Sequence, residues 1–508
     1  METRTDRQSA GGPDIAPTLA STAPGTICRV PAGVVETHIS ILFFVGDRVF
    51  KLRKPVQFGF VDFRQREARR QDCEREVALN QRLAPDVYLG VADLSLQGVP
   101  LDHMVVMRRM PEDRRLATMA LRGDDLGEPV HQIARTMATF HRRAARSATI
   151  SAEATAEAVG AGWEQNLQET SRFVGTVLDA EIDAAIRALA ARWVSGRAPL
   201  LKARIAAGHV CDGHGDLQAG DIFCLPDGVR ILDCLEFSDH LRYADVCADV
   251  AFLAMDLERL GFREAAGQFV VAYEEAAHDR FPDTLVHFSC ASRAYVRAKV
   301  ACLRAEQGAS DAAAEARLLH DLALQHLRQA QVKLVVVGGL PGSGKSTVAA
   351  GVSHETSWPV IRSDEVRREI TPDGVERYGQ EATARTYGEL LRRAEGLLGL
   401  GQSVLLDASF VQASRRAGAA AVADRTQSDL VELRCHAPAD TEMERVRRRL
   451  AEGTDLSEAT PKVAAAMATA MDPWPTSHLI TTAEGSAEVP IGRVLHLLEF
   501  RDFRHGQG

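Results

Sequence analysis

Short runs in which apolar and polar residues alternate fill the N-terminal quarter of the chain. Residues 34–52, VVETHISILFFVGDRVFKL, alternate, are rich in β-branched side chains and contain a Gly-Asp turn, so they predict a hairpin with Lys51 near the end of its second strand. Residues 63–83 combine charged faces with one apolar edge and predict a helix. Residues 104–110, MVVMRRM, predict a further strand. Together they predict an α+β region.

The pattern becomes helical in the middle of the chain. Residues 128–205 are rich in alanine and predict helices, and residues 209–238 return to short strands and turns. Helices follow again, and residues 311–330 predict a connecting helix. We place a domain boundary near residue 329, where the composition changes.

Beyond this boundary, strand-like runs alternate with helical segments. Such alternation predicts a parallel sheet with helices on both faces, the α/β arrangement. The predicted strands are residues 333–338, 359–363, 403–409, 429–435 and 478–482.

Size and composition agree with a multidomain globular protein. A chain of 508 residues predicts two or three domains. The net charge of −9 disfavours a general binder of nucleic acids or membranes. Nine cysteines without C-x-x-C spacing disfavour a zinc or disulfide framework.

The N-terminal segment is polar and rich in small residues. Residues 1–26 lack the apolar core of a signal peptide and predict a disordered tail. No run approaches the ~20 apolar residues that span a bilayer. We therefore expect a cytoplasmic protein that does not associate with membranes.

The stretch GLPGSGKS has the spacing of a phosphate-binding loop of the Walker A type. It follows a predicted strand and begins a predicted helix, so backbone N–H groups and the helix N-terminus can hold phosphates. Lys345 is placed to reach the β and γ phosphates, and Ser346 to bind Mg²⁺. A chance match in a structural loop is the alternative. The predicted ATP contacts are Gly339, Pro341, Gly342, Ser343, Gly344, Lys345, Ser346 and Thr347.

Charged residues follow the next predicted strands. Asp364 could accept a proton from a hydroxyl group and Arg367 could hold an anionic acceptor, although Asp364 could instead be a helix N-cap. Asp407 could hold the Mg²⁺ shell through water, or be a turn residue. Arg445, Arg448 and Arg449 could form a lid that closes on ATP, or a solvated helix face.

This region resembles the P-loop kinases that include the 5′-hydroxyl kinase domain of polynucleotide kinases, the zeta-toxin kinases and gluconate kinase. The resemblance rests on GLPGSGKS, RSDEVR and LLDASF. It implies that Asp364 is the catalytic base and Arg367 the acceptor clamp. From the phosphate loop itself we also expect Lys345 to be catalytic. It does not specify the acceptor.

A second candidate site surrounds GHGDLQAGDIF. Asp216, Asp221 and Asp233 follow the spacing of a kinase catalytic base and two Mg²⁺ ligands. The alternative is that these carboxylates form turns and N-caps. The stretch resembles the aminoglycoside phosphotransferase-like branch of the kinase fold, in which Asn usually stands where this chain has Asp221. The extra charge beside a polyphosphate is expected to alter metal affinity, ATP affinity or activity.

The resemblance also implies roles for residues outside that stretch. Lys51 would contact the α and β phosphates, and Glu76, or alternatively Glu74, would hold Lys51. Asp249 would brace the catalytic loop. ETHIS at 36–40 could cover the phosphates. For Lys51, the alternative is a solvated lysine at the end of a strand.

The complete order of motifs resembles bacterial proteins described as bifunctional aminoglycoside phosphotransferase/ATP-binding proteins, in which a kinase-like domain is fused to a P-loop, AAA-type ATP-binding domain. We therefore expect a tail at 1–26, a protein-kinase-like domain at 27–328 with lobes near 27–125 and 126–328, and an α/β P-loop kinase domain at 329–508.

The expected function is a phosphotransferase with two Mg²⁺–ATP sites that phosphorylates a small hydroxylated acceptor. Two alternatives remain. The N-terminal half could be a regulatory pseudokinase that senses a ligand, or the P-loop half could be a 5′-hydroxyl nucleic-acid kinase, although the acidic balance disfavours nucleic acid.

Overall fold

The computed structural model describes residues 32–37, 39–58, 61–371, 379–452, 460–482, 488–500 and 504. The predicted tail at 1–26 and His38 of ETHIS lie outside this part of the chain. The chain divides into two compact units, one of Met1–Asp125 with Asp216–Leu241 and one of Leu126–Gly215 with Arg242–Gly508. The boundary predicted near residue 329 falls within the second unit, and the domain limits stay a prediction.

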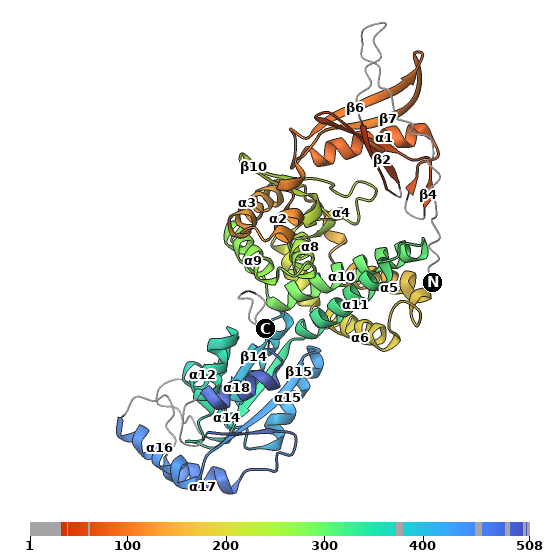
Figure 1. Cartoon of the computed structure of the whole chain (residues 1–508). Coiled ribbons are helices and arrows are strands. Elements are labelled where there is room, and N and C mark those ends of the chain that lie inside the picture. The colour runs from red at the N-terminus through yellow and green to blue at the C-terminus, as the bar shows by residue number, and fades with distance from the viewer. Residues whose placement is uncertain are drawn as a thin grey trace, which may run out of the picture. The chain divides into compact units, whose positions relative to one another are not determined.

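The first unit is built on a five-stranded antiparallel sheet with the order β1-β2-β3-β7-β6 (Figure 1). The predicted hairpin is confirmed as β2 and β3, joined at Gly46, whose φ of 58° suits a glycine. The strands are β1 (Ala32–Glu36), β2 (Ser40–Val45), β3 (Arg48–Arg53), β6 (Tyr88–Leu96) and β7 (Val99–Arg108).

Helix α1 (Arg66–Asn80) confirms the predicted helix and packs on this sheet. Cys73 and Val77 on its inner face join Val49 and Val105 of the sheet in one buried cluster. The rest of the unit consists of short elements: β4 (Gln57–Phe58), β5 (Val61–Asp62), η1 (Glu112–Arg114), α2 (Leu116–Arg122), η3 (Ala219–Asp221), β9 (Ile222–Leu225) and β10 (Gly228–Ile231).

The second unit begins with helices, as the alanine-rich pattern predicted. Its longest helix, α10, packs against α8 and α11. The elements are α3 (Gly127–Arg143), α4 (Ala148–Ala152), α5 (Ala156–Thr170), η2 (Ser171–Phe173), α6 (Ala180–Gly196), α7 (Ala198–Ala206), β8 (Val210–Asp212), β11 (Tyr243–Asp245), α8 (Val246–Arg259), α9 (Arg263–Ala277), α10 (Asp283–Glu306) and α11 (Ala312–Gln329).

A five-stranded parallel sheet with the order β13-β14-β12-β15-β16 follows in the same unit. All five predicted strands and the α/β arrangement are confirmed. The strands are β12 (Lys333–Gly338), β13 (Val360–Arg362), β14 (Val404–Asp407), β15 (Asp429–His436) and β16 (His478–Thr481). Because the strands are parallel, their carboxyl ends meet at one edge of the sheet, where α/β proteins bind ligands.

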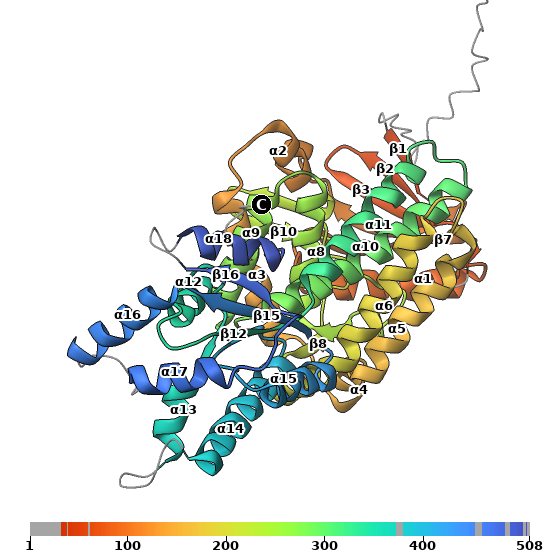
Figure 2. The ribbon, with the colours of Figure 1, turned by 90° about the horizontal axis from the view of Figure 1, so that it is seen from below.

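Helices cover both faces of this sheet (Figure 2). Leu334 and Val336 of β12 face a buried cluster that includes α14 and α15, whereas Val335 and Val337 face α12 and α18. The helices are α12 (Lys345–Thr356), α13 (Ser363–Ile370), α14 (Gln380–Gly399), α15 (Ala413–Arg425), α16 (Ala439–Glu452), α17 (Pro461–Thr469) and α18 (Glu488–Leu497). Over the described residues, every helix is too short or too polar to cross a membrane.

Arg197 joins the helical part of the second unit to the P-loop part. Its buried guanidinium donates hydrogen bonds to the carbonyl oxygens of Leu398 in α14 and Thr426 after α15. Helix C-termini carry partial negative charge, so these carbonyls suit a cation. The contact holds the two parts together inside one compact unit.

Candidate active sites

The loop between β12 and α12 has the backbone that phosphate binding requires. Gly339, Gly342 and Gly344 have φ values of 144°, 86° and 82°, a region that favours glycine. A Cβ at Gly342 would lie 2.2 Å from the carbonyl oxygen of Glu442. Both the turn and the close packing behind it therefore require glycine here.

Arg445 of α16 supports this loop from behind. Its Nη1 donates to the carbonyl oxygen of Gly342 at 3.2 Å, and its Nη2 donates to that of Thr482 at 2.7 Å. The hydroxyl group of Thr482 in turn donates to the carbonyl oxygen of Ser343 at 2.6 Å. Arg445 thus positions the loop backbone.

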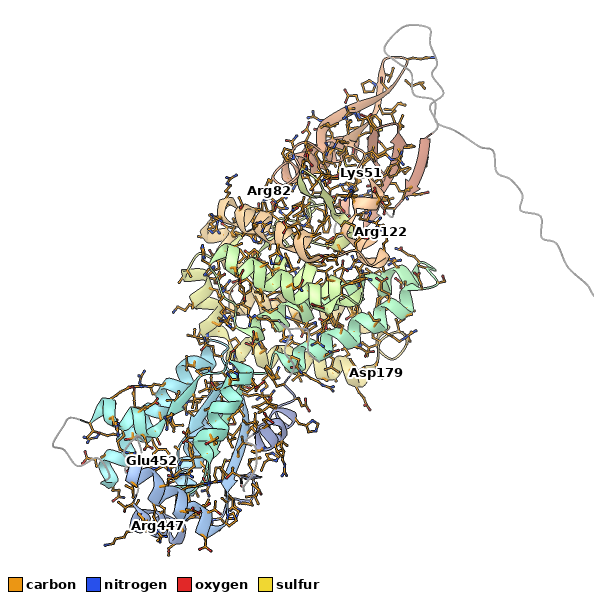
Figure 3. All side chains as sticks on the ribbon, turned by 60° about the vertical axis from the view of Figure 1, so that its left-hand side comes forward. Lys51, Arg82, Arg122, Asp179, Arg447 and Glu452 are labelled. Atoms are coloured by element: carbon orange, nitrogen blue, oxygen red, sulfur yellow. The ribbon has the colours of Figure 1, made fainter. Side chains whose placement is uncertain are left out.

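Arg448 belongs to the same helix but is placed differently. Its side chain is 68% exposed, and its Nε lies 4.0 Å from Glu452. Figure 3 labels Arg447 and Glu452 on this helix. Among the described residues, no hydrogen bond or ion pair joins Arg448 to the loop, so its role as an ATP ligand stays a prediction. The sequence pattern could not separate Arg445 from its neighbours, because several arginines follow one another there.

The predicted phosphate ligands stand at the start of α12. Lys345, Ser346 and Thr347 form its first turn, where free N–H groups and the helix dipole favour anions. Within the described residues, the ammonium group of Lys345 has no hydrogen bond or ion pair, which leaves it available to phosphate. Pro341 and Ser343 are buried in the loop, and the Oγ of Ser343 has no hydrogen-bond partner among the residues that the structure describes.

Asp407 ends β14 beside this loop. It pairs in the sheet register with Val337 of β12 and Arg362 of β13. Its Oδ2 accepts a hydrogen bond from Arg362 Nε at 3.3 Å, whereas its buried Oδ1 has no partner in the part of the chain that the structure describes. A buried carboxylate oxygen without a donor fits a hydrated Mg²⁺ ion. Sequence reasoning missed Arg362, although it directly precedes the SDEVR stretch.

Asp364 and Arg367 form an ion pair in the first turns of α13. Arg367 Nη1 lies 2.6 Å from Asp364 Oδ1, and both side chains are mostly buried. The residue before the helix is Arg362, so the alternative interpretation of Asp364 as the N-cap is wrong. The helix follows β13, which brings the pair to the same sheet edge as Asp407.

Lys51 of β3, labelled in Figure 3, has acidic residues around its ammonium group. Its Nζ is 2.8 Å from Glu76 Oε1 and 3.1 Å from Asp233 Oδ1. The carboxylate of Glu76 is fully buried, whereas Glu74 is 52% exposed and pairs with Arg70. Of the two predicted candidates, Glu76 is therefore the partner of Lys51. The alternative of a solvated lysine is wrong, because its side chain is only 13% exposed.

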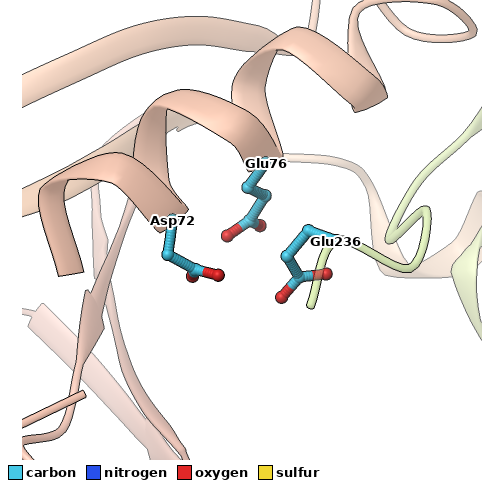
Figure 4. Close-up of side chains that lie close together, drawn as sticks. All are labelled: Asp72, Glu76 and Glu236. Carbon is cyan, nitrogen blue, oxygen red and sulfur yellow. The ribbon is translucent and has the colours of Figure 1, made fainter. Parts of the chain in front are cut away.

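Three buried carboxylates, from Asp72, Glu76 and Glu236, converge beside this lysine (Figure 4). They surround Arg53, which lies 2.6 Å from Asp72, 2.7 Å from Glu76 and also contacts Glu236. The guanidinium group of Arg53 therefore occupies the position that a metal ion would take among these carboxylates. Burial, and then repulsion from Glu76, raise the pKa of Glu236 to about 7.

Sequence reasoning missed Arg53. Strand alternation offered a clue, since Lys51 and Arg53 are two residues apart and share one face of β3. The hydroxyl group of Ser40 accepts from Arg53 Nη1 at 2.8 Å, so this serine of ETHIS supports the cluster from β2. A contact of Ser40 with phosphates stays a prediction.

Asp233 has an unusual backbone conformation. Its φ is 61°, which is rare for a residue other than glycine, and its N–H donates to the hydroxyl group of Tyr88 at 3.2 Å. Strained residues of this kind gather at functional sites. The conformation aims the carboxylate at Lys51.

Asp221 is close to the two other predicted acidic residues. Burial, and then the charges of Asp233 and Asp216, raise the pKa of Asp221 well above its ordinary value. Its carbonyl oxygen accepts from the N–H of Leu232 at 2.9 Å, which ties η3 to the strand before Asp233. Asp216 accepts from Gln218 at 2.8 Å. The charge of Asp221 is thus influenced by those of Asp216, Asp233 and Lys51.

Asp249 of α8 braces the loop that leads to Asp216, as the resemblance implied. Its carboxylate accepts from the backbone N–H groups of His214 at 2.7 Å and Gly215 at 2.9 Å. His141 Nε2 lies 3.0 Å away on the other side. Burial alone would raise the pKa of Asp249, but these donors, chiefly His141, hold it well below its ordinary value.

Comparisons with known proteins match most of the chain and, separately, its P-loop part. Protein Rv2004c of Mycobacterium tuberculosis and protein Mb2027c of Mycobacterium bovis are each 41% identical over 475 residues, which cover 91% of this chain and 95% of the relative. A family profile described as an AAA domain matches residues 334–474.

Solved structures match about one third of the chain. The APS kinase CysC of Mycobacterium tuberculosis is 23% identical and covers 34% of this chain and 99% of its own, with a TM-score of 0.28. A gluconokinase from Sinorhizobium meliloti is 17% identical and covers 34% of this chain and 97% of its own, with a TM-score of 0.26.

Proposed function

This chain belongs to the same family as the mycobacterial proteins Rv2004c and Mb2027c, and we propose that it is an ATP-dependent phosphotransferase with two Mg²⁺–ATP sites. One site is the P-loop edge of the parallel sheet. The other is the acidic cluster around Lys51 in the first unit. The observation that carries the second site is that Lys51 contacts both Glu76 and Asp233. The P-loop and its parallel sheet do not explain this contact.

At the P-loop site, the protein positions and neutralises a triphosphate. Loop N–H groups and Lys345 hold the β and γ phosphates, and Arg445 keeps the loop in place. Ser346 and Asp407 would hold Mg²⁺, which offsets the negative charge of the phosphates. The chemistry is positioning and charge stabilisation.

The acceptor at this site would approach Asp364. Arg367 holds this carboxylate at 2.6 Å. An anionic acceptor would compete for the guanidinium group and leave Asp364 able to take the proton of the hydroxyl group. A small acceptor that carries both a hydroxyl and an anionic group fits this pair best.

At the N-terminal site, the resemblance to aminoglycoside phosphotransferase-like kinases supplies the roles. Lys51, held by Glu76, would contact the α and β phosphates, and Asp216 would accept the proton of the acceptor hydroxyl group. Asp221 and Asp233 would hold Mg²⁺. The protein-kinase-like assignment of residues 27–328 is supported by the five-stranded sheet with α1 and by the braced loop before Asp216.

Nucleotide stoichiometry tests the proposal. Isothermal titration of the full chain with Mg²⁺ and a nonhydrolysable ATP analogue should give two sites for the wild type, and one site each for Lys345→Ala and Asp233→Ala. ADP release should also be measured with candidate sugars, nucleosides, aminoglycosides and oligonucleotides, and we expect it to depend on the acceptor. Lys345→Ala should remove the ADP release of the P-loop site, and Asp216→Ala that of the N-terminal site.

The matched control is Lys202→Ala, which changes an exposed lysine of α7. It should bind and turn over like the wild type. If Lys345→Ala and Asp216→Ala also behave like the wild type, the assignment is wrong. A 5′-hydroxyl nucleic-acid kinase would instead show oligonucleotide-dependent ADP release whose affinity falls steeply with salt.

A further inference from the structure

A cavity of about 580 Å³ lies at the amino edge of the parallel sheet. Its wall includes Lys333 at the start of β12 and Trp358 just before β13. The P-loop follows the other end of β12, five residues further on and thus about 17 Å along the strand. The cavity is therefore separate from the proposed ATP site.

Segments from both parts of the second unit form this cavity. The turn between α9 and α10 contributes Arg280 and Phe281, and the loop before β14 contributes Gln402. The last turn of α12 contributes Thr356. Binding cavities are common where two parts of a fold meet, and this volume suits a small organic molecule.

Lys333 is the unusual residue of this wall. Within the described part of the chain, its ammonium group has no hydrogen bond or ion pair, and burial lowers the pKa of Lys333. The carboxylates of Asp429 and Glu499 attract this ammonium group over a longer range, and that of Asp429 is already 2.5 Å from Arg192. A desolvated cation without a partner costs folding free energy, and an anion in the cavity would offset this cost.

The side chains that line the cavity carry more positive than negative charges. Arg280 is exposed at the cavity and has no ion pair with any described residue. Arg504 is neutralised, because it pairs with Asp283 and with Glu274. Lys333 and Arg280 thus remain as the two cations available to a ligand.

The wall also offers flat apolar surface. Trp358 is partly exposed, and its ring meets that of Phe500 edge to face with 5.9 Å between centroids. Phe281 is buried behind the cavity. Aromatic faces of this kind bind planar ligands well.

We propose that this cavity binds a small planar organic anion, with its acidic group held by Lys333 and Arg280 and its apolar part against Trp358. The ligand class is an aromatic or heteroaromatic carboxylate, sulfonate or phosphate. This inference goes beyond phosphotransfer and does not depend on it.

The dye 8-anilinonaphthalene-1-sulfonate is a suitable probe, because it joins one sulfonate group to planar rings. Titrated into the full chain, it should bind saturably at one site and quench tryptophan emission. Trp358 is the tryptophan that lines the cavity. Lys333→Met should weaken binding about tenfold, because it removes a partly buried charge pair. Lys202→Met, an exposed lysine outside the cavity, should have no effect.

Two further measurements separate binding from folding. Without dye, Lys333→Met should melt at a higher temperature than the wild type, because the unpaired cation is gone. Arg280→Met changes an exposed residue and should weaken dye binding severalfold without loss of structure. Wild-type dye affinity in both variants, or displacement of the dye by Mg²⁺–ATP in the wild type, would overturn the proposal.

Discussion

The carboxylate of Asp249 accepts a hydrogen bond from the backbone N–H of His214, with 2.7 Å between oxygen and nitrogen. Because His214 stands two residues before Asp216, this bond fixes the path of the chain into the proposed catalytic loop. A Cβ at Gly213 would come within 2.5 Å of the same carboxylate, so glycine is required beside it. A buried acid on one helix thus sets the position of the loop.

Asp249→Asn should loosen this loop. An amide cannot accept from three donors as the carboxylate does, and we expect the unfolding free energy to fall by about 2–4 kcal/mol. In a Lys345→Ala background, kcat of the N-terminal site should fall more than its affinity for ATP, because Asp216 loses its position. Urea unfolding and ADP release measure the two effects.

Asp256→Asn is the control for this change. Asp256 is buried on the same helix and pairs with Arg259 at 2.7 Å, away from the loop. It should cost stability and leave kcat unchanged. Equal losses of kcat in the two variants would mean that Asp249 acts only through stability.

Asp221→Asn tests whether the N-terminal site is active. Burial and two neighbouring carboxylates disfavour the charge of Asp221, and an amide removes this repulsion while keeping a metal-binding oxygen. Measured in the Lys345→Ala background, ADP release should rise severalfold. Loss of ADP release would instead identify Asp221 as an essential ligand. Absence of turnover in both proteins, with ATP still bound, would favour the regulatory pseudokinase.

Glu236 should make stability depend on pH. Its pKa is raised from the ordinary value of 4.5 to about 7, so between these values the folded state binds more protons than the unfolded state. Glu236 therefore makes its full contribution to the free energy of unfolding below pH 4.5. This contribution, on the order of 3 kcal/mol, is lost as the pH rises to about 7.

The comparison of wild type with Glu236→Gln isolates this contribution. Urea unfolding at several pH values should show a smaller fall in stability over that range for the variant. Glu74→Gln, an exposed change on α1, should keep the wild-type dependence. Parallel curves for wild type and Glu236→Gln would contradict the prediction.

The P-loop region could be predicted closely from the chain alone. Strands that are buried on both faces are continuous apolar runs, and the glycines between them are required by backbone geometry, so local sequence determines both. The same holds for the β2–β3 hairpin and for Lys51 on its second strand. These features depend on neighbours within a few residues.

Tertiary structure decided the contacts between distant segments. Arg362 meets Asp407 across 45 residues, Arg445 meets Gly342 across 103, and Arg53 meets Glu236 across 183. The spacing of residues along the chain does not predict these contacts, because they depend on how the helices between the residues fold and pack. Lys333 has no hydrogen bond or ion pair from its ammonium group among the described residues, and only the folded chain reveals this. In the sequence it is an ordinary lysine at one end of a strand.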